Sequence, residues 1–217
     1  MLELYAHPFS SYCWKVLIPL YENDTPFTYR ILERDYPENG AAFARQWPIG
    51  KFPLLVDDGR PVMESSVIIE HLQRHHPGPV RFIPEGDAAL EVRMLDRIFD
   101  NHVMNQMNRV VANALRGPER HDSIEVEEAK AALQKVYAWL DRWLAGRQWA
   151  AADMFSLADC AAAPALFYAD WVDRIPEGLT NLTAYRARLL ARPSVARVVD
   201  EARPYRPYFP LGAPERD

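Results

Sequence analysis

The sequence predicts two domains, an α/β domain followed by an all-α domain. Up to about residue 78, short strand-like runs alternate with helix-like segments. After that point nearly every segment has the periodicity of a helix. Residues 79–87 contain Pro79 and Pro84, and they are predicted to link a domain at residues 1–78 to a domain at residues 88–217.

The predicted order of the first domain is strand, helix, strand, helix, strand, strand, helix. Leu2–Tyr5 alternates in polarity and Phe27–Leu32 is rich in β-formers, so both are predicted as strands. A right-handed crossover would make these two strands parallel. Asp58-Gly59 separates the apolar runs Leu54–Val56 and Pro61–Met63, which predicts a hairpin. Helices are predicted at residues 11–21, 37–46 and 65–75.

The second domain is predicted to be a helical bundle. Its helices are expected at residues 88–115, 123–144, 156–172, 181–191 and 194–202. In the first of them, apolar residues recur every four positions, namely Leu95, Phe99, Val103, Met107 and Val111. The helix at 156–172 is apolar on all sides, which predicts a central, buried position. Residues 205–217 are rich in proline and are expected to form an extended arm.

Composition argues against several classes of function. The 25 basic and 30 acidic residues give a net charge of −5, so no nucleic-acid partner is expected. The longest apolar run, Cys160–Ala169, is too short to cross a bilayer, so no membrane association is expected. No basic and apolar leader precedes Leu2, and two cysteines form no disulfide framework. These features predict a cytoplasmic protein.

The first chemical signal is Ser10-Ser11-Tyr12-Cys13, where the first strand gives way to the first helix. A helix N-terminus carries unpaired N–H groups and partial positive charge, so it stabilises an anion such as a thiolate. A serine hydroxyl at this place can donate a hydrogen bond to that thiolate. The alternative is that Ser10 or Ser11 only caps the helix.

Two further signals lie at the edge of the predicted sheet. Phe52 is held extended by Pro53, and a proline that opens a strand leaves neighbouring backbone free to pair with an extended ligand. Ser65 begins a helix and can face a carboxylate, while Glu64 can hold an ammonium group. Together Glu64 and Ser65 suit the head group of an α-amino acid. The alternative readings are an ordinary strand start and an ordinary helix cap.

In this order and within this pattern of elements, the signals resemble the cytosolic glutathione transferase family. The resemblance covers nearly the whole chain. Residues 46–56 are similar to the loop that leads into the family's cis-proline strand, Glu64-Ser65 to its γ-glutamyl-binding pair, and Phe155–Asp159 to its helix-capping motif. The resemblance implies a thioredoxin-like βαβ-α-ββα domain, a C-terminal helical domain, glutathione as co-substrate and a homodimer.

The same resemblance assigns roles to the residues at the sheet edge. It implies that Pro53 is cis, that the backbone of Phe52 pairs with the cysteinyl unit of glutathione, and that Lys51 reaches the glycyl carboxylate. Glu64 and Ser65 would hold the γ-glutamyl head. Asp100 resembles an acid that reaches a glutathione bound to the other subunit.

The catalytic position falls on Ser10 or Ser11. Residues 10–16 resemble the zeta-class motif Ser-Ser-Cys-x-Trp-Arg-Val, in which the first serine, here Ser10, activates the thiol. The chain departs from that motif at Tyr12, where the zeta class has cysteine, so a zeta-like bacterial member is predicted. Tyr5, near the place used by tyrosine-type members, and Cys13, a redox candidate, remain alternatives.

The pocket for a small hydrophobic electrophile is expected beside the first helix and along the first long helix of the second domain. The residues assigned to it are Tyr12, Met104, Met107 and Tyr168, of which the methionines also suit an ordinary core. The predicted activity is attack of the glutathione thiolate on that electrophile. The alternatives are a glutathione-dependent isomerase of the maleylacetoacetate type and a non-catalytic protein that binds a partner.

No metal is assigned from the sequence. His71, His75 and His76 cluster at the end of one predicted helix, where histidines also interact favourably with the helix dipole. A metal site would need a third ligand in a fixed geometry, and the sequence alone supplies none.

Overall fold

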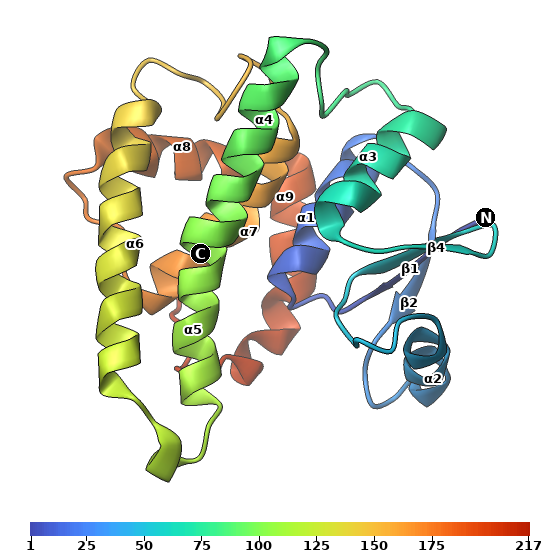
Figure 1. Cartoon of the computed structure of the whole chain (residues 1–217), viewed down its shortest axis with the longest axis horizontal. Helices are drawn as coiled ribbons and strands as arrows, with labels where there is room; N and C mark the ends of the chain where they lie inside the picture. Colours follow the sequence, from blue (N-terminus) through green and yellow to red (C-terminus); the bar gives the residue numbers. More distant parts are fainter.

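The computed structural model describes all 217 residues, and its first part confirms the predicted α/β domain. The elements are β1 (Leu2–Ala6), α1 (Ser11–Glu22), β2 (Thr28–Ile31), α2 (Pro37–Gln46), β3 (Leu54–Asp57), β4 (Arg60–Val62) and α3 (Ser65–His75). The sheet order is β2-β1-β3-β4. β1 and β2 are parallel, and the other two pairings are antiparallel. Helices α1 and α3 lie on one side of the sheet and α2 on the other (Figure 1).

Alternation along β1 explains this layering. Leu2, Leu4 and Ala6 point into the main hydrophobic core, whereas Tyr5 belongs to a small second cluster. That cluster contains Phe43 of α2, whose ring stacks on Tyr5 at 6.4 Å. Because successive side chains of a strand point to opposite faces, one short strand anchors both layers.

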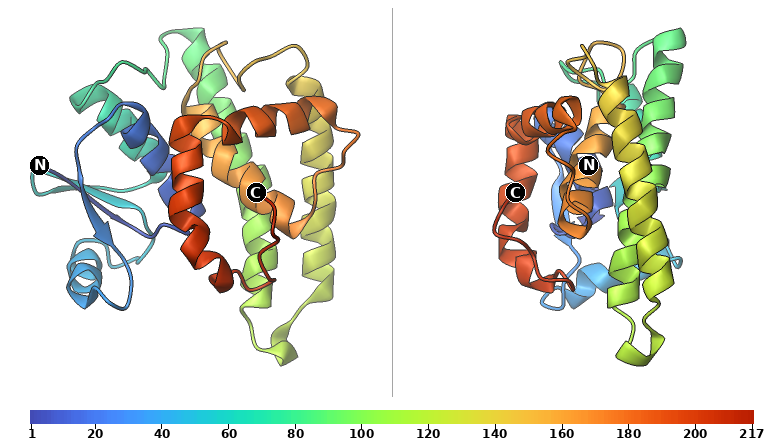
Figure 2. Two further views of the ribbon diagram at one scale, coloured as in Figure 1. Left: turned by 180° about the vertical axis from the view of Figure 1, so that it is seen from behind. Right: turned by 90° about the vertical axis from the view of Figure 1, so that its left-hand side faces the viewer.

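The second domain is helical, as predicted. Its helices are α4 (Asp87–Ile98), η1 (Phe99–Met104), α5 (Asn105–Ala114), α6 (Ser123–Trp143), α7 (Leu157–Val172), α8 (Thr180–Leu190) and α9 (Pro193–Ala202). Short 3₁₀ turns span Pro118–Arg120 and Arg203–Tyr208. Views from behind and from the side show these helices packed beside the α/β domain, with α9 against α1 (Figure 2). None of the helices combines the length and the apolar character that a bilayer span requires.

Helix α7 occupies the centre, as its apolar composition predicts. All 16 of its residues are buried, and it contacts α1, α4, η1, α5 and α8. Its N-terminus is fixed by Asp159, whose carboxylate accepts hydrogen bonds from the backbone N–H groups of Ser156 (2.8 Å) and Ala150 (3.0 Å). The Tyr185 hydroxyl donates a further bond to Asp159 at 2.7 Å. The predicted capping box is therefore present, and both carboxylate oxygens of Asp159 accept hydrogen bonds.

The predicted helix at 88–115 is continuous but not uniformly α. Residues Phe99–Met104 form a π-helical turn, η1, between α4 and α5. Leu95, Phe99, Val103 and Met107 are all buried. A four-residue repeat is longer than the 3.6 residues of an α-helical turn, so a wider turn is needed to keep these side chains on one face.

Two predicted irregular segments are more ordered than expected. The segment between α3 and α4 is packed down, since the Gln73 side chain accepts bonds from the N–H groups of Phe82 and Ile83. The C-terminal arm is extended only in part, because Arg203–Tyr208 is a 3₁₀ helix that continues directly from α9. The chain end then folds back, with Asp217 bound to Arg203 at 2.6 Å.

Candidate active site

Two cavities meet at the start of α1. The first, of about 640 Å³, is lined mostly by polar and charged residues and lies between the sheet edge, α3 and α4. The second, of about 550 Å³, is more apolar and lies between α1, α5 and the C-terminal segment. Tyr12, Lys51 and Phe52 line both of them. A ligand in the first cavity can therefore contact a ligand in the second only beside these three residues.

The start of α1 faces the second cavity through Ser10 and Ser11. Ser10 occupies the N-cap position with extended backbone angles, but its side chain makes no capping hydrogen bond. The capping bond of the alternative reading is therefore absent at Ser10. Ser10 instead lies against the Cys13 thiol, which also accepts a bond from the His7 N–H at 3.4 Å.

Two alternatives to serine, Cys13 and Tyr5, are poorly placed for activating a thiol, whereas Tyr12 is accessible. Cys13 is completely buried, and burial raises the pKa of its thiol to about 12. A reactive cysteine needs the opposite shift. Tyr5 is packed in the cluster with Phe43 and lines neither cavity. Tyr12 does line both cavities, and burial, followed by the nearby Asp100 carboxylate, raises the pKa of its phenol to about 12. It therefore stays a hydrogen-bond donor at neutral pH.

Glu64 and Ser65 lie together at the start of α3, in the first cavity. Glu64 has a φ of +67°, in the left-handed region that non-glycine residues avoid. Such a conformation costs roughly 1–3 kcal/mol, and it is typical of functional positions. It turns the chain so that α3 begins at Ser65, where the first N–H groups of the helix have no partner within the helix. An anion can bind there.

The opposite wall of the first cavity is the segment before β3. The Phe52–Pro53 peptide bond is cis, as the resemblance implies. Phe52 is partly exposed, and Lys51 is exposed beside it. Together with Glu64 and Ser65, these residues place an acidic group, a helix N-terminus and a basic group along one groove. That arrangement suits an extended ligand with charged ends.

A buried ionic network closes the floor of the first cavity. Lys15 of α1 is 1% exposed, and its ammonium lies 2.5 Å from Asp96, 2.7 Å from Asp100 and 3.0 Å from the Ser66 hydroxyl. Burial raises the pKa of Asp100, and Lys15 and Arg97 oppose that shift. Asp100 lines the cavity but is bound within its own chain.

Three of the four residues assigned to the second pocket line it, and one does not. Tyr12, Met107 and Tyr168 face the second cavity, where the Tyr168 hydroxyl donates to the Phe9 carbonyl at 2.9 Å. Met104 is 1% exposed and lines neither cavity, because η1 turns it into the core. The spacing of Met104 in the sequence suited a pocket wall and the core equally well, and in the structure the π-helical turn directs its side chain into the core.

Sequence reasoning missed several wall residues. Tyr208, Phe209 and Pro210 of the C-terminal arm line the second cavity, and Trp47 and Arg97 line the first. The aromatic residues of the predicted extended arm are a signal that could have indicated the three residues of the second cavity. No local pattern indicates Arg97, since its position depends on how α4 packs against α3.

Family models match both domains. Residues 4–80 match the glutathione S-transferase N-terminal domain, and residues 103–193 match the glutathione S-transferase C-terminal domain. The chain belongs to the glutathione S-transferase family. A relative in Escherichia coli strain K12, "Glutathione S-transferase GstB", is 28% identical over 211 residues, which is 92% of this chain and 98% of the relative.

Solved structures agree with this assignment. A glutathione S-transferase from Methylobacillus flagellatus KT, solved with GSH bound, is 26% identical, with a TM-score of 0.80 over 91% of this chain and 98% of that one. "Ure2p in Complex with Glutathione" has a TM-score of 0.78 at 18% identity over 92% of this chain and 94% of that one, a likeness of fold alone. The predicted family, fold and transferase class are confirmed, whereas the serine-type and zeta-like assignment stays a prediction.

Proposed function

We propose that this glutathione S-transferase binds glutathione in the first cavity and a hydrophobic electrophile in the second. Glutathione would extend from Glu64 and Ser65, which hold its γ-glutamyl head, past Phe52 toward Lys51. Its sulfur would then lie at the start of α1. The observation that carries the proposal is that the two cavities join at Tyr12, Lys51 and Phe52, beside the N-terminus of that helix.

In the proposed reaction, Ser10 donates a hydrogen bond to the thiolate. Lowering a thiol pKa by two units needs roughly 2.7 kcal/mol. A hydrogen bond to a charged group contributes about 1.5–3 kcal/mol and a helix terminus about 0.3–1 kcal/mol, so the two together reach that amount. The thiol proton leaves to solvent, the sulfur–carbon bond forms, and a leaving group departs with its electron pair. An activated double bond takes up the electron pair and a proton instead.

The binding half of the proposal is tested by calorimetry with glutathione on the wild type and on Ser65→Ala. We expect binding by the wild type and a loss of about tenfold or more in the variant, because a hydrogen bond to a carboxylate is removed. Ser123→Ala, which changes a serine at the start of α6 that lines neither cavity, is the matched control. If millimolar glutathione does not bind the wild type, the proposal fails and a partner-binding role becomes the better reading.

The catalytic half is tested by Ser10→Ala, Ser11→Ala and Tyr12→Phe with a chromogenic electrophile. Ser10→Ala is expected to lower kcat by about 10²-fold while glutathione affinity changes little, since the bond is made mainly to the thiolate. An unchanged kcat in Ser10→Ala would move the role to whichever of Ser11 or Tyr12 shows the loss. Maleylacetone as substrate distinguishes isomerisation from conjugation.

We also propose that the protein is a homodimer. Three large apolar side chains are exposed on neighbouring helices: Val67 of α3 at 53%, and Leu90 and Met94 of α4 at 66% and 44%. The two helices are joined there by the ion pair between Arg93 and Glu70. Light scattering is expected to give twice the chain mass for the wild type and the monomer mass for Leu90→Glu. A monomeric wild type would refute this proposal.

A further inference from the structure

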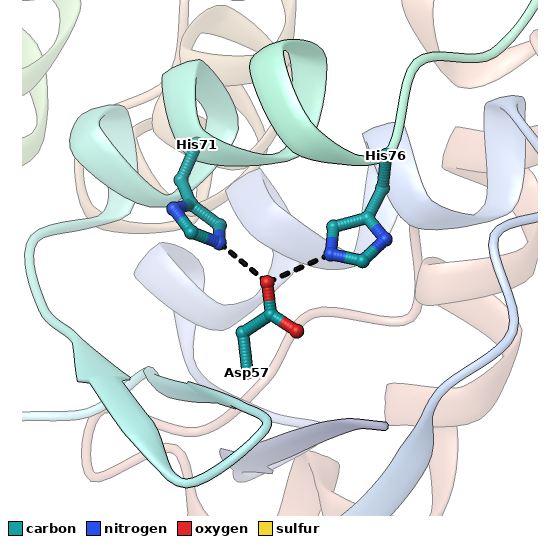
Figure 3. A group of neighbouring side chains, drawn as sticks. All are labelled: Asp57, His71 and His76. Atoms are coloured by element: carbon teal, nitrogen blue, oxygen red, sulfur yellow. Dashed lines mark hydrogen bonds and ion pairs between the residues drawn. The ribbon is translucent and has the colours of Figure 1, made fainter.

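Asp57, His71 and His76 form a side-chain cluster outside both cavities (Figure 3). The same oxygen of Asp57 lies 2.8 Å from Nε2 of His71 and 2.8 Å from Nε2 of His76. The three ligand atoms all lie within 4.8 Å of one another. We propose that this cluster is a binding site for a divalent transition-metal ion, with Zn²⁺ as the ion that its ligands suit.

The ligand set supports this choice. Two imidazoles and one carboxylate are the protein ligands of many three-ligand zinc sites, in which water takes the fourth position. Imidazole nitrogen also suits Zn²⁺ better than the hard cations Mg²⁺ and Ca²⁺, which prefer oxygen ligands. Each imidazole can coordinate in its neutral form, once its ring proton moves through solvent from Nε2 to Nδ1.

The distances need only a small adjustment. Zinc bonds to nitrogen and oxygen of 2.0–2.2 Å place tetrahedral ligand atoms about 3.3–3.6 Å apart. Each contact to Asp57 would therefore open by about 0.5–0.8 Å from the present 2.8 Å, and the two Nε2 atoms, which lie within 4.8 Å of each other, would take the same separation. Rotation of the His76 side chain would provide this, since that side chain is the most exposed of the three at 33%. The same exposure gives the ion and its water a route from solvent.

The backbone holds two of the three ligands on regular structure and the third directly after it. Asp57 ends β3 and is paired with Leu2 and Arg60 in the sheet. His71 lies within α3, and His76 is the residue that caps it, with its N–H bound to the Leu72 carbonyl at 2.8 Å. A site built on elements such as these is already arranged before the ion binds.

A metal here would join two elements whose other ends carry the predicted glutathione contacts. β3 begins directly after Pro53, and α3 begins at Ser65. The ion would lie at the far end of both, so its expected effect is to stabilise the α/β domain rather than to take part in the reaction. This inference is independent of the proposed function and can fail without it.

The test uses the full chain without a histidine tag, treated with a chelator and titrated with Co²⁺ as the spectroscopic probe. We expect one Co²⁺ per chain with visible d–d absorption, and displacement of that ion by Zn²⁺. At Zn²⁺ concentrations about 100 times its Kd, the melting temperature should rise by about 5–10 °C.

His76→Ala is the most informative variant, because its partly exposed ring can be removed with little effect on packing. It should weaken metal binding at least about 100-fold, and Asp57→Asn should do the same. His75→Ala is the matched control, since the ring centroid of His75 lies 4.5 Å from that of His71 but His75 is not one of the three ligands. Its metal affinity should stay within about twofold of the wild type, a change too small for a lost ligand.

Two results would overturn the inference. If the wild type takes up no Co²⁺ or Zn²⁺ at large excess, the cluster is only a hydrogen-bonded clamp between β3 and α3. If His75→Ala and His76→Ala weaken binding equally, the histidines form an unspecific surface patch. Circular dichroism spectra of each variant separate loss of the site from loss of the fold.

Discussion

Replacing Lys15 by methionine should destabilise the protein through the two carboxylates that it leaves behind. Lys15, Asp96 and Asp100 are 1%, 2% and 5% exposed, so all three charges lie away from solvent. Without the ammonium, the only remaining cation beside both carboxylates is that of Arg97, whose side chain is 51% exposed. Breaking a buried pair by removing one partner costs about 3–5 kcal/mol.

The size of the effect on melting follows from chain length. For a protein of this size, 1 kcal/mol corresponds to about 2–4 °C, so Lys15→Met should lower the melting temperature by about 6–20 °C. Urea unfolding followed by circular dichroism measures the free energy directly. Adding Asp96→Asn and Asp100→Asn to Lys15→Met should restore much of the lost stability, because no uncompensated buried charge remains. A loss below about 1 kcal/mol for Lys15→Met, or losses that simply add in the triple variant, would refute this reasoning.

Three further predictions concern single residues. Burial lowers the pKa of His7, so the unfolded chain binds a proton more readily than the folded protein. The free energy of unfolding should therefore fall as pH drops below about 6.5 toward the lowered pKa of the folded state. The midpoint of urea unfolding should depend less steeply on pH in His7→Gln than in the wild type. Asp159→Ala should cost at least about 3 kcal/mol, because it leaves buried donors unpaired. The exposed Asp35→Ala should be nearly neutral in the same melt. Met104→Ala should cost about 2–5 kcal/mol of stability without changing KM for an electrophile. Leu115 lines the second cavity and is 70% exposed, so Leu115→Ala should change KM and leave stability unchanged. The opposite pattern would show that the second cavity is not the substrate pocket.

Sequence patterns predicted an element correctly where the interactions that form it lie between residues close together in the chain. The Asp58-Gly59 turn, the capping box at Ser156 and Asp159, and the uniformly apolar run of α7 each predicted an element that the structure contains. For the turn and the capping box, the free energy that decides the conformation comes from neighbours within a few residues. The same is true of Pro53 and Ser65, whose positions at an element boundary could be read directly from the chain.

Features that depend on packing between distant segments could not be predicted in this way. Asp57 lies 14 residues from His71 and 19 from His76, so the sequence indicated a histidine cluster without its carboxylate. Met104 was assigned to a pocket wall because spacing alone cannot tell which side of a helix faces a cavity. Cys13 was a redox candidate by motif, and only its complete burial shows that its thiol is held protonated.

The π-helical turn at Phe99–Met104 determines which residues of the long helix face each of the two cavities. Each four-residue step on an ideal α-helix overshoots a full turn by about 40°, so Leu95 and Met107 would face directions about 120° apart on a straight rod. The widened turn takes up that excess, and it lets one continuous helix present Asp100 to the first cavity and Met107 to the second. It therefore sets the rotation of α5 relative to α4, and with it the direction in which each helix faces its cavity. Deleting the exposed Asn101 would remove the surplus residue and allow an ordinary α-turn, leaving the faces of α4 and α5 aligned while Asp100 shifts in its cavity.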